Sequence, residues 1–230
     1  MKPNIFQLID LDRTLFNTSR FAEVVNNIVD RWEPGLGKEI GERFEATYKS
    51  EVTFFVLEFI RERFGPEKYA ELTKEVAKHF QPEELYLPGA KERITRAEEL
   101  TSFRPAYGIL TMAQSPADQH MKLGLIGLED VPVLITDTPD KAAVIRSWMT
   151  PEGKFQLPFE FGGELVDELT FEDDKIRAFI GLPEHVTGVW ITSREDAAER
   201  LEETGLQNVH IANDLLESYD LLARNIATRI

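Results

Sequence analysis

Apolar residues follow a helical period through the first third of the chain. Between residues 21 and 32 they recur three or four positions apart, which is the spacing that one face of an α-helix presents. The same spacing returns from about residue 38 to 63 and from 67 to 79, and Gly65-Pro66 separates these two stretches, because both residues interrupt helices. We find no strand pattern between residues 18 and 88. This block is therefore predicted to be a helical insertion.

The rest of the chain alternates short apolar runs with helical stretches. Alternation of this kind is typical of βαβ units and of a parallel sheet covered on both faces. We therefore predict an α/β fold, a Rossmann-like parallel sheet flanked by helices, with residues 1–17 and 89–230 forming the core and residues 18–88 an inserted all-helical domain. Residues 150–163 are predicted to be a long irregular connection. The predicted strands cover residues 4–11, 106–111, 131–136, 169–172, 186–191 and 209–211, and the predicted helices 116–125, 139–149, 174–180, 194–204 and 215–226.

Charge and composition restrict the partners of this chain. It carries 41 acidic and 26 basic residues, a formal net charge of −15, which opposes binding to nucleic acid or to an anionic membrane. The absence of cysteine excludes disulfides, thiol nucleophiles and cysteine-bound metal. No apolar run approaches the roughly 20 residues that span a bilayer, and residues 1–15 do not resemble a signal peptide. We expect a cytoplasmic protein without nucleic-acid or membrane partners.

Polar side chains follow several of the predicted strands at the points where those strands end. The first strand ends in Asp10-Leu11-Asp12, and residues two apart on an extended segment project to the same side, so Asp10 and Asp12 can face one ligand. Thr111 ends the second strand, Lys141 lies just inside the helix after the third, and Asp173-Asp174 closes the fourth. Ligands of open parallel sheets bind outside the carboxyl ends of the strands. These residues are therefore predicted to meet at one edge of the sheet.

The chemistry of this set is that of phosphoryl transfer. Crowded carboxylates repel one another, and a hard cation such as Mg²⁺ relieves the repulsion. One carboxylate can attack phosphorus to form an aspartyl-phosphate, and a second can protonate the leaving oxygen and later activate water. Lys141 and the Thr111 hydroxyl can bind phosphoryl oxygens. Because the acidic surface repels anionic substrates, such local cations are necessary.

Four sequence motifs occur in an order that points to a known family. They are Asp10-Leu11-Asp12-Arg13-Thr14 after an apolar strand, Gly108-Ile109-Leu110-Thr111, Lys141 at a helix start, and the acidic pair in Phe171-Glu172-Asp173-Asp174. The helical block lies between the first and second motifs. Over nearly its whole length the chain resembles the haloacid dehalogenase (HAD) superfamily, specifically phosphatase-like members with a helical, C1-type cap.

This resemblance implies a role for each motif residue. Asp10 would be the nucleophile and Asp12 the general acid/base. The metal ligands would be Asp10, the Asp12 backbone carbonyl, Asp173 and Asp174, directly or through water, with Mg²⁺ as the metal. Thr111 and Lys141 would bind the phosphoryl group. The resemblance implies a phosphatase acting on a small phosphorylated metabolite chosen by the cap, in a monomer or a weak homodimer.

Some features of the sequence leave alternatives open. Arg13 replaces the glycine most common between Asp12 and Thr14, and Met112-Ala113-Gln114 lacks the usual Asn or Gly after the second motif. Asp167-Glu168 is a competing acidic pair for the fourth motif. A phosphomutase would use the same aspartyl-phosphate. A dehalogenase is disfavoured because a halide leaving group needs no acid such as Asp12, and an inactive binding protein that retains the fold is the non-enzyme alternative.

Overall fold

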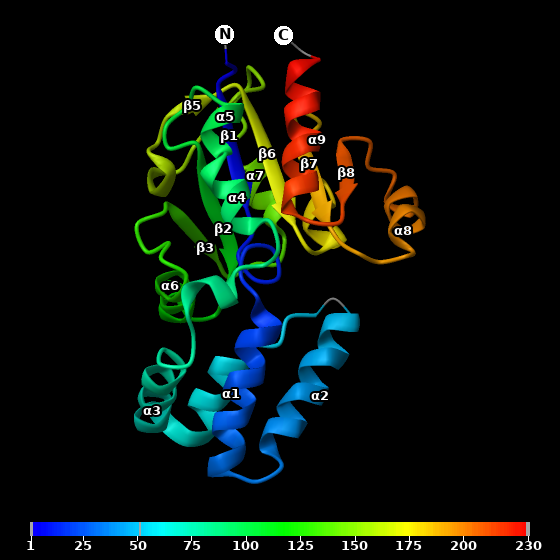
Figure 1. Cartoon of the computed structure of the whole chain (residues 1–230). Helices are drawn as coiled ribbons and strands as arrows, with labels where there is room; N and C mark the ends of the chain where they lie inside the picture. The colour runs from blue at the N-terminus through cyan, green and yellow to red at the C-terminus, as the bar shows by residue number, and fades with distance from the viewer. Residues whose placement is uncertain (1, 51, 229–230) are drawn as a thin grey trace. The chain divides into compact units, whose positions relative to one another are not determined.

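The computed structural model describes residues 2–50 and 52–228, without the side chains of residues 48 and 49. It divides into two compact units (Figure 1). The first unit comprises the chain up to Leu15, Leu87–Met112, and the chain from Asp130 onward. The second comprises Phe16–Tyr86 and Ala113–Glu129.

The first unit is built on a six-stranded sheet in which every neighbouring pair of strands is parallel, in the order β3-β2-β1-β6-β7-β8. The predicted α/β class with a Rossmann-like parallel sheet is confirmed. All five residues of the central strand β1 are buried, which explains why it is an almost unbroken apolar run. The strands are β1 Ile5–Ile9, β2 Tyr107–Met112, β3 Val133–Thr136, β6 Glu168–Asp173, β7 Val186–Ile191 and β8 Val209–Ala212.

Helices cover both faces of this sheet. One face packs against α4 Ala90–Thr95, α5 Ala97–Leu100 and α9 Leu215–Ala227. The other face packs against α7 Lys141–Arg146, the 3₁₀ helices η2 Phe159–Phe161 and η3 Ile176–Phe179, and α8 Ala197–Thr204. Successive side chains of a strand alternate between the two faces. Phe6 and Leu8 of β1 and Leu169 and Phe171 of β6 therefore all lie in the core beneath α7.

Residues 150–163, predicted to be an irregular connection, contain a short strand and a 3₁₀ helix, so that prediction is wrong. Strand β4 (Phe155–Gln156) pairs antiparallel with β5 (Leu165–Val166), and η2 lies between them. Its Phe161 packs so closely on β2 that a Cβ atom at Gly108 would lie 2.7 Å from the Phe161 ring. Glycine at position 108 thus leaves room for the Phe161 ring against the sheet.

The second unit is helical. It contains α1 Thr18–Trp32, α2 Leu36–Lys49, α3 Val56–Val76, η1 Pro82–Leu85 and α6 Pro116–Leu125. Asn17 caps α1 by accepting a hydrogen bond from the Arg20 backbone amide, as asparagine commonly does. Residues 18–50 and 52–88 contain no strand, although an isolated bridge pairs Phe16 with Tyr86.

The single helix predicted for residues 38–63 is wrong. Helix α2 ends at Lys49 and α3 begins at Val56. The run Val52-Thr53-Phe54-Phe55 is β-branched and aromatic, and such residues lose side-chain freedom in a helix. The Arg43 guanidinium also lies over the Phe54 ring, 4.5 Å from its centre. The break predicted at Gly65-Pro66 is present as a kink within α3, where Gly65 has φ 81° and ψ 172°.

Helix α6 belongs to the second unit, although its sequence follows β2. Arg61 of α3 bonds Asp118 Oδ1 at 2.7 Å and Ser115 Oγ at 3.2 Å, and the Tyr86 hydroxyl donates to the Ile126 carbonyl at 2.7 Å. The assignment of residues 18–88 as a separate domain stays a prediction. In the described part of the chain, no helix combines the length and apolar character needed to cross a membrane.

Candidate active site

Three carboxylates converge where β1 and β6 end. Asp10 follows β1, Asp173 is the last residue of β6, and Asp174 comes next. One oxygen from each lies within 4.8 Å of the others. The register explains the meeting, because Ile9 is paired with Glu172 and the Asp10 amide donates to the Glu172 carbonyl at 2.9 Å. Asp10 therefore stands beside Asp173 at the same edge of the sheet.

Lys141 contacts two of these carboxylates. It is the first residue of α7, a helix capped by Asp140, whose side chain accepts from the Ala143 amide at 2.8 Å. Its Nζ atom donates to Asp173 Oδ2 at 2.7 Å and to Asp10 Oδ1. By strand alternation Asp10 and Asp173 project to the face that α7 covers. Lys141 is 6% exposed, so these bonds form largely away from solvent.

The remaining carboxylate oxygens differ in their partners. Thr14 Oγ1 donates to Asp10 Oδ2 at 3.4 Å, and the Lys175 backbone amide donates to Asp173 Oδ1 at 2.8 Å. Asp174 Oδ2 is buried and has no hydrogen-bond partner among the described residues. A buried acceptor of this kind costs free energy unless a ligand or a proton satisfies it.

Burial and crowding shift the pKa values of the cluster. Burial raises the pKa of Asp10 from 3.8 to about 7; the charges of Asp173 and Asp12 act in the same direction, and Lys141 opposes them. Burial, followed by the charges of Asp173 and Asp10, raises the pKa of Asp174 well above its ordinary value. Burial by itself would lower the pKa of Lys141, but Asp10 and Asp173 outweigh it and raise that pKa. The lysine therefore stays charged, while burial and the mutual repulsion of the carboxylates favour a proton on Asp10 and Asp174.

The residues of this cluster fit a hard divalent cation. The donors are carboxylate oxygens, which Mg²⁺ prefers, and Asp174 supplies a buried oxygen without a partner. The raised pKa values of Asp10 and Asp174 show that the folded protein favours a positive charge or a proton here. Asp12 is not in this side-chain group. Its predicted contribution is its backbone carbonyl, which stays a prediction.

Asp12 and Thr111 lie in the same unit as the carboxylates. Asp12 is half-buried, and its charge helps to raise the Asp10 pKa, so it is near the nucleophile candidate. Thr111 is buried in β2, the neighbour of β1 on the side away from β6, one residue before the strand ends. Their predicted roles, acid/base catalysis and phosphoryl binding, remain predictions.

Arg13 has a left-handed backbone with φ 65°. Only glycine adopts this region without a steric cost from Cβ, which gives a physical reason for the glycine more common at this position.

Asp167-Glu168, the alternative acidic pair for the fourth motif, lies away from the carboxylate cluster. Asp167 precedes β6 and pairs with Lys154 at 2.7 Å, at the opposite end of the strand from Asp173. The pair that lies beside Asp10 is Asp173-Asp174.

The sequence did not reveal the polar residues behind the site. Glu172 is fully buried and forms an ion pair with the fully buried Arg93. A glutamate inside the apolar run before Asp173 was the available signal, because a buried acid requires a partner. Nothing in the sequence indicated that the partner would be Arg93.

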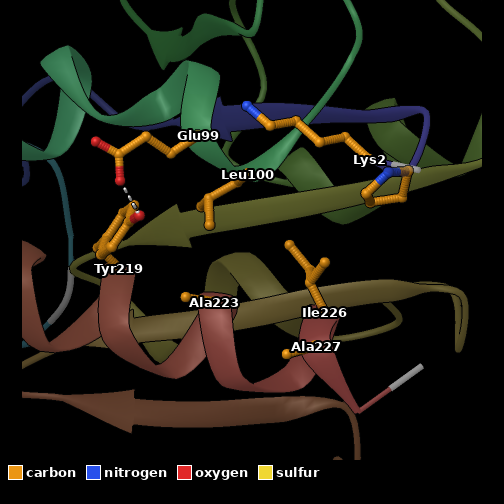
Figure 2. Close-up of a pocket in the computed structure, with 8 residues that line it drawn as sticks. Lys2, Glu99, Leu100, Tyr219, Ala223, Ile226 and Ala227 are labelled. Carbon is orange, nitrogen blue, oxygen red and sulfur yellow. Dashed lines mark hydrogen bonds between the residues drawn. The ribbon is translucent and has the colours of Figure 1, made fainter. Parts of the chain in front are cut away.

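A groove of about 460 Å³ lies elsewhere in the first unit (Figure 2). It is lined by residues that include Lys2, Glu99 and Tyr219, and the Tyr219 hydroxyl donates to Glu99 at 2.6 Å. Lys2 and Pro3 precede β1, whereas Asp10 follows it. The groove is therefore at the other end of the strand and does not belong to the carboxylate cluster.

No family model and no curated protein sequence matches this chain. Solved structures do match it over nearly their full length. A haloacid dehalogenase-like protein from Burkholderia xenovorans LB400 has a TM-score of 0.62 at 16% identity, with 96% of this chain and 98% of that chain covered. The magnesium-bound HAD-family protein YfnB from Bacillus subtilis has a TM-score of 0.56 at 14% identity, with coverage of 96% and 99%.

A further similar structure is that of a protein from Thermotoga maritima named as a beta-phosphoglucomutase. Its TM-score is 0.50 at 15% identity, with 98% of this chain and 99% of that chain covered. The chain thus has the fold of the haloacid dehalogenase-like hydrolases, and the resemblance inferred from the motifs is confirmed at the level of fold.

Proposed function

We propose that this protein is a magnesium-dependent phosphatase that hydrolyses a small phosphorylated metabolite through an aspartyl-phosphate on Asp10. One observation carries the proposal. Lys141 joins Asp10 to Asp173, and Asp174 adds a buried oxygen without a partner at the same edge of the sheet. An ammonium can bind phosphoryl oxygens, and converging carboxylates can hold the metal ion that stabilises the charge of phosphoryl transfer.

The reaction proceeds in two displacements at phosphorus. A carboxylate oxygen of Asp10 attacks, the bond from phosphorus to the leaving oxygen breaks, and protonated Asp12 gives its proton to that oxygen. Asp12, now a carboxylate, then takes a proton from water as the water oxygen attacks the phosphoryl group. The bond from phosphorus to Asp10 breaks, inorganic phosphate leaves, and Asp12 is protonated again.

Other residues hold the phosphoryl group and its charge. Lys141, whose pKa is raised, and the Thr111 hydroxyl bind phosphoryl oxygens. Asp10, Asp173, Asp174 and the Asp12 backbone carbonyl would hold Mg²⁺, which when bound offsets the carboxylate repulsion and polarises the phosphoryl group. The magnesium in the YfnB structure supports this choice of metal.

Residues 18–88 are proposed to act as a cap that selects the substrate. Caps of this kind exclude bulk water and complete the site on closure. The net charge of −15 disfavours nucleic acid as a partner, so a small phosphorylated molecule is the substrate class we propose.

A phosphomutase is the second candidate, because it would use Asp10 and Asp12 in the same first step. The structural similarity to the Thermotoga maritima protein named as a beta-phosphoglucomutase supports the phosphomutase as an alternative function. The two activities differ only in whether water or a sugar hydroxyl accepts the phosphoryl group. Asp12 near Asp10 argues against a dehalogenase, and the presence of every expected group argues against an inactive binding protein.

The test is phosphate release from a panel of phosphorylated metabolites and p-nitrophenyl phosphate. It is run with Mg²⁺, with EDTA, and with the Asp10→Asn variant; Asp167→Asn is the control because Asp167 is exposed and lies at the other end of β6. We expect turnover that requires both the metal and Asp10 and that Asp167→Asn leaves unchanged. Isomerisation of a sugar phosphate without phosphate release would establish the mutase instead, and neither activity in the folded protein would refute both.

A further inference from the structure

A fully buried ion pair lies behind the carboxylate cluster. Arg93 of α4 donates to Glu172 of β6 through Nε at 3.1 Å and through Nη2 at 2.7 Å, and both side chains are 0% exposed. Ser218 of α9 donates a further hydrogen bond to Glu172 Oε1. Two helices on the same face of the sheet thus hold one carboxylate.

Glu172 connects this ion pair to the site through its backbone. Its carbonyl accepts the Asp10 amide at 2.9 Å, and its successor in the chain is Asp173. Side chains alternate along a strand, so Glu172 points toward α4 and α9 while Asp173 points toward Lys141 and α7. A movement of the Glu172 backbone would therefore displace Asp10, which is bonded to its carbonyl, and Asp173, which follows it in the chain.

The ion pair is a poor stabiliser of the fold. Removing two charges from water costs several kcal/mol each, and well-packed hydrophobic replacements of a buried pair are often neutral or stabilising. A bidentate pair does, however, fix geometry more strictly than apolar packing does. The guanidinium also balances a fourth carboxylate close to the three that already repel one another. Both properties suit a role in positioning.

We propose that Arg93 is a positioning residue of the site. It acts through Glu172, from the face of the sheet opposite Lys141, and keeps the ends of β1 and β6 in the register that brings Asp10, Asp173 and Asp174 together. The effect on catalysis rests on the proposed phosphatase function, whereas the effect on the backbone at Asp10 does not.

The test replaces the pair without leaving a lone buried charge. The double variant Arg93→Met/Glu172→Leu is compared with Arg93→Lys and with Thr101→Val. Thr101 bonds the Ile5 amide at 3.1 Å and the Ile5 carbonyl at 2.6 Å at the amino end of β1, so its variant destabilises the same strand away from the site. The measurements are amide hydrogen exchange at Asp10 and Phe6, Mg²⁺ affinity by calorimetry, and kcat and KM.

The double variant is expected to fold. Its Asp10 amide should exchange at least about tenfold faster than in wild type, while the exchange rate of the Phe6 amide stays the same. It should bind Mg²⁺ about 10- to 100-fold more weakly, which is the range for residues that support metal ligands. We expect kcat to fall more than KM rises, Arg93→Lys to be intermediate, and Thr101→Val to affect neither the Asp10 amide nor the metal affinity.

Wild-type exchange at Asp10 and wild-type Mg²⁺ affinity in a folded double variant would overturn the proposal. An equal effect of Thr101→Val on the Asp10 amide would overturn it as well, since the change would then be general. If the double variant does not fold, Arg93→Lys and Ser218→Ala decide by the same measurements. Faster exchange at Asp10 in a protein whose wild type lacks turnover would refute the proposed function and leave the positioning role standing.

Discussion

Lys141 Nζ lies 2.7 Å from Oδ2 of Asp173, and both side chains are buried. This bond joins the first residue of α7 to the last residue of β6, which lies 32 positions further along the chain. The same nitrogen contacts Asp10. Lys141 thus connects the ends of β1 and β6, and the burial of this contact has measurable consequences.

Replacing Lys141 by Met is expected to destabilise the metal-free protein. The change leaves two buried carboxylates without their cation, and breaking a buried pair in this way costs about 3 kcal/mol or more. The matched control is Lys154→Met, because Lys154 pairs with Asp167 where both side chains are about half exposed and such pairs contribute about 1 kcal/mol or less. Urea unfolding in EDTA at pH 8 measures both. Equal losses would show that Lys141 is not the essential counter-charge, and added Mg²⁺ should restore part of the Lys141→Met loss.

Because of Asp10, the metal-free protein is expected to become less stable as the pH rises. The folded pKa of Asp10 is about 7 and its ordinary value is 3.8, so between these values the unfolded chain has released a proton that the folded chain retains. The contribution of Asp10 to the free energy of unfolding then falls with pH, by at most roughly 1.4 kcal/mol per pH unit, and levels off above about pH 7.

Asp10→Asn removes this dependence. Relative to wild type, the variant should therefore gain stability between pH 4 and pH 7, as measured by urea unfolding in EDTA at several pH values. Asp167→Asn, at an exposed position, should show no such trend. A stability difference between Asp10→Asn and wild type that stays constant with pH would mean that Asp10 is ionised in the folded protein throughout this range.

Asp12→Asn is expected to lower kcat most for substrates with a poor leaving group. If Asp12 protonates the leaving oxygen, its loss lowers kcat on an alkyl phosphate by about 10²- to 10⁴-fold. p-Nitrophenolate leaves readily without a proton, so the first step on p-nitrophenyl phosphate should suffer much less. Burst-phase kinetics with both substrates separates this step from hydrolysis of the aspartyl-phosphate. The same loss with both substrates would assign Asp12 a role other than general acid.

Arg13→Gly is expected to stabilise the fold relative to Arg13→Ala. Both variants remove the guanidinium, but alanine keeps the Cβ that is strained at φ 65°, at a cost of about 1 kcal/mol. Thermal unfolding of the two variants measures the difference, which is reduced by the greater entropy of glycine in the unfolded chain. Comparison of each variant with wild type in the turnover assay shows whether the arginine side chain contributes to substrate use. A more stable Arg13→Ala than Arg13→Gly would contradict the expected strain.

The sequence by itself determined the α/β class and predicted which charged residues lie together at the edge of the sheet. Strand ends are marked by local patterns, and parallel strands present their carboxyl ends at one edge. The sequence therefore predicted that Asp10, Lys141 and Asp173-Asp174 lie in one cluster. The choice of Asp173-Asp174 over Asp167-Glu168 depended on where a short apolar run ends and on the distance to the next predicted strand.

Tertiary structure decided what local patterns do not encode. The helical period continued through residues 38–63, yet the structure ends α2 at Lys49, and residues 155–166 form a small hairpin whose Phe161 packs against Gly108. The ion pair of Arg93 with Glu172 joins residues 79 positions apart. Sequence periodicity reports which face of an element is buried, whereas the partner on that face depends on how distant elements pack. The pairing of Arg93 with Glu172 behind the site could therefore be found only in the folded chain, whereas the site residues themselves could be predicted from the sequence.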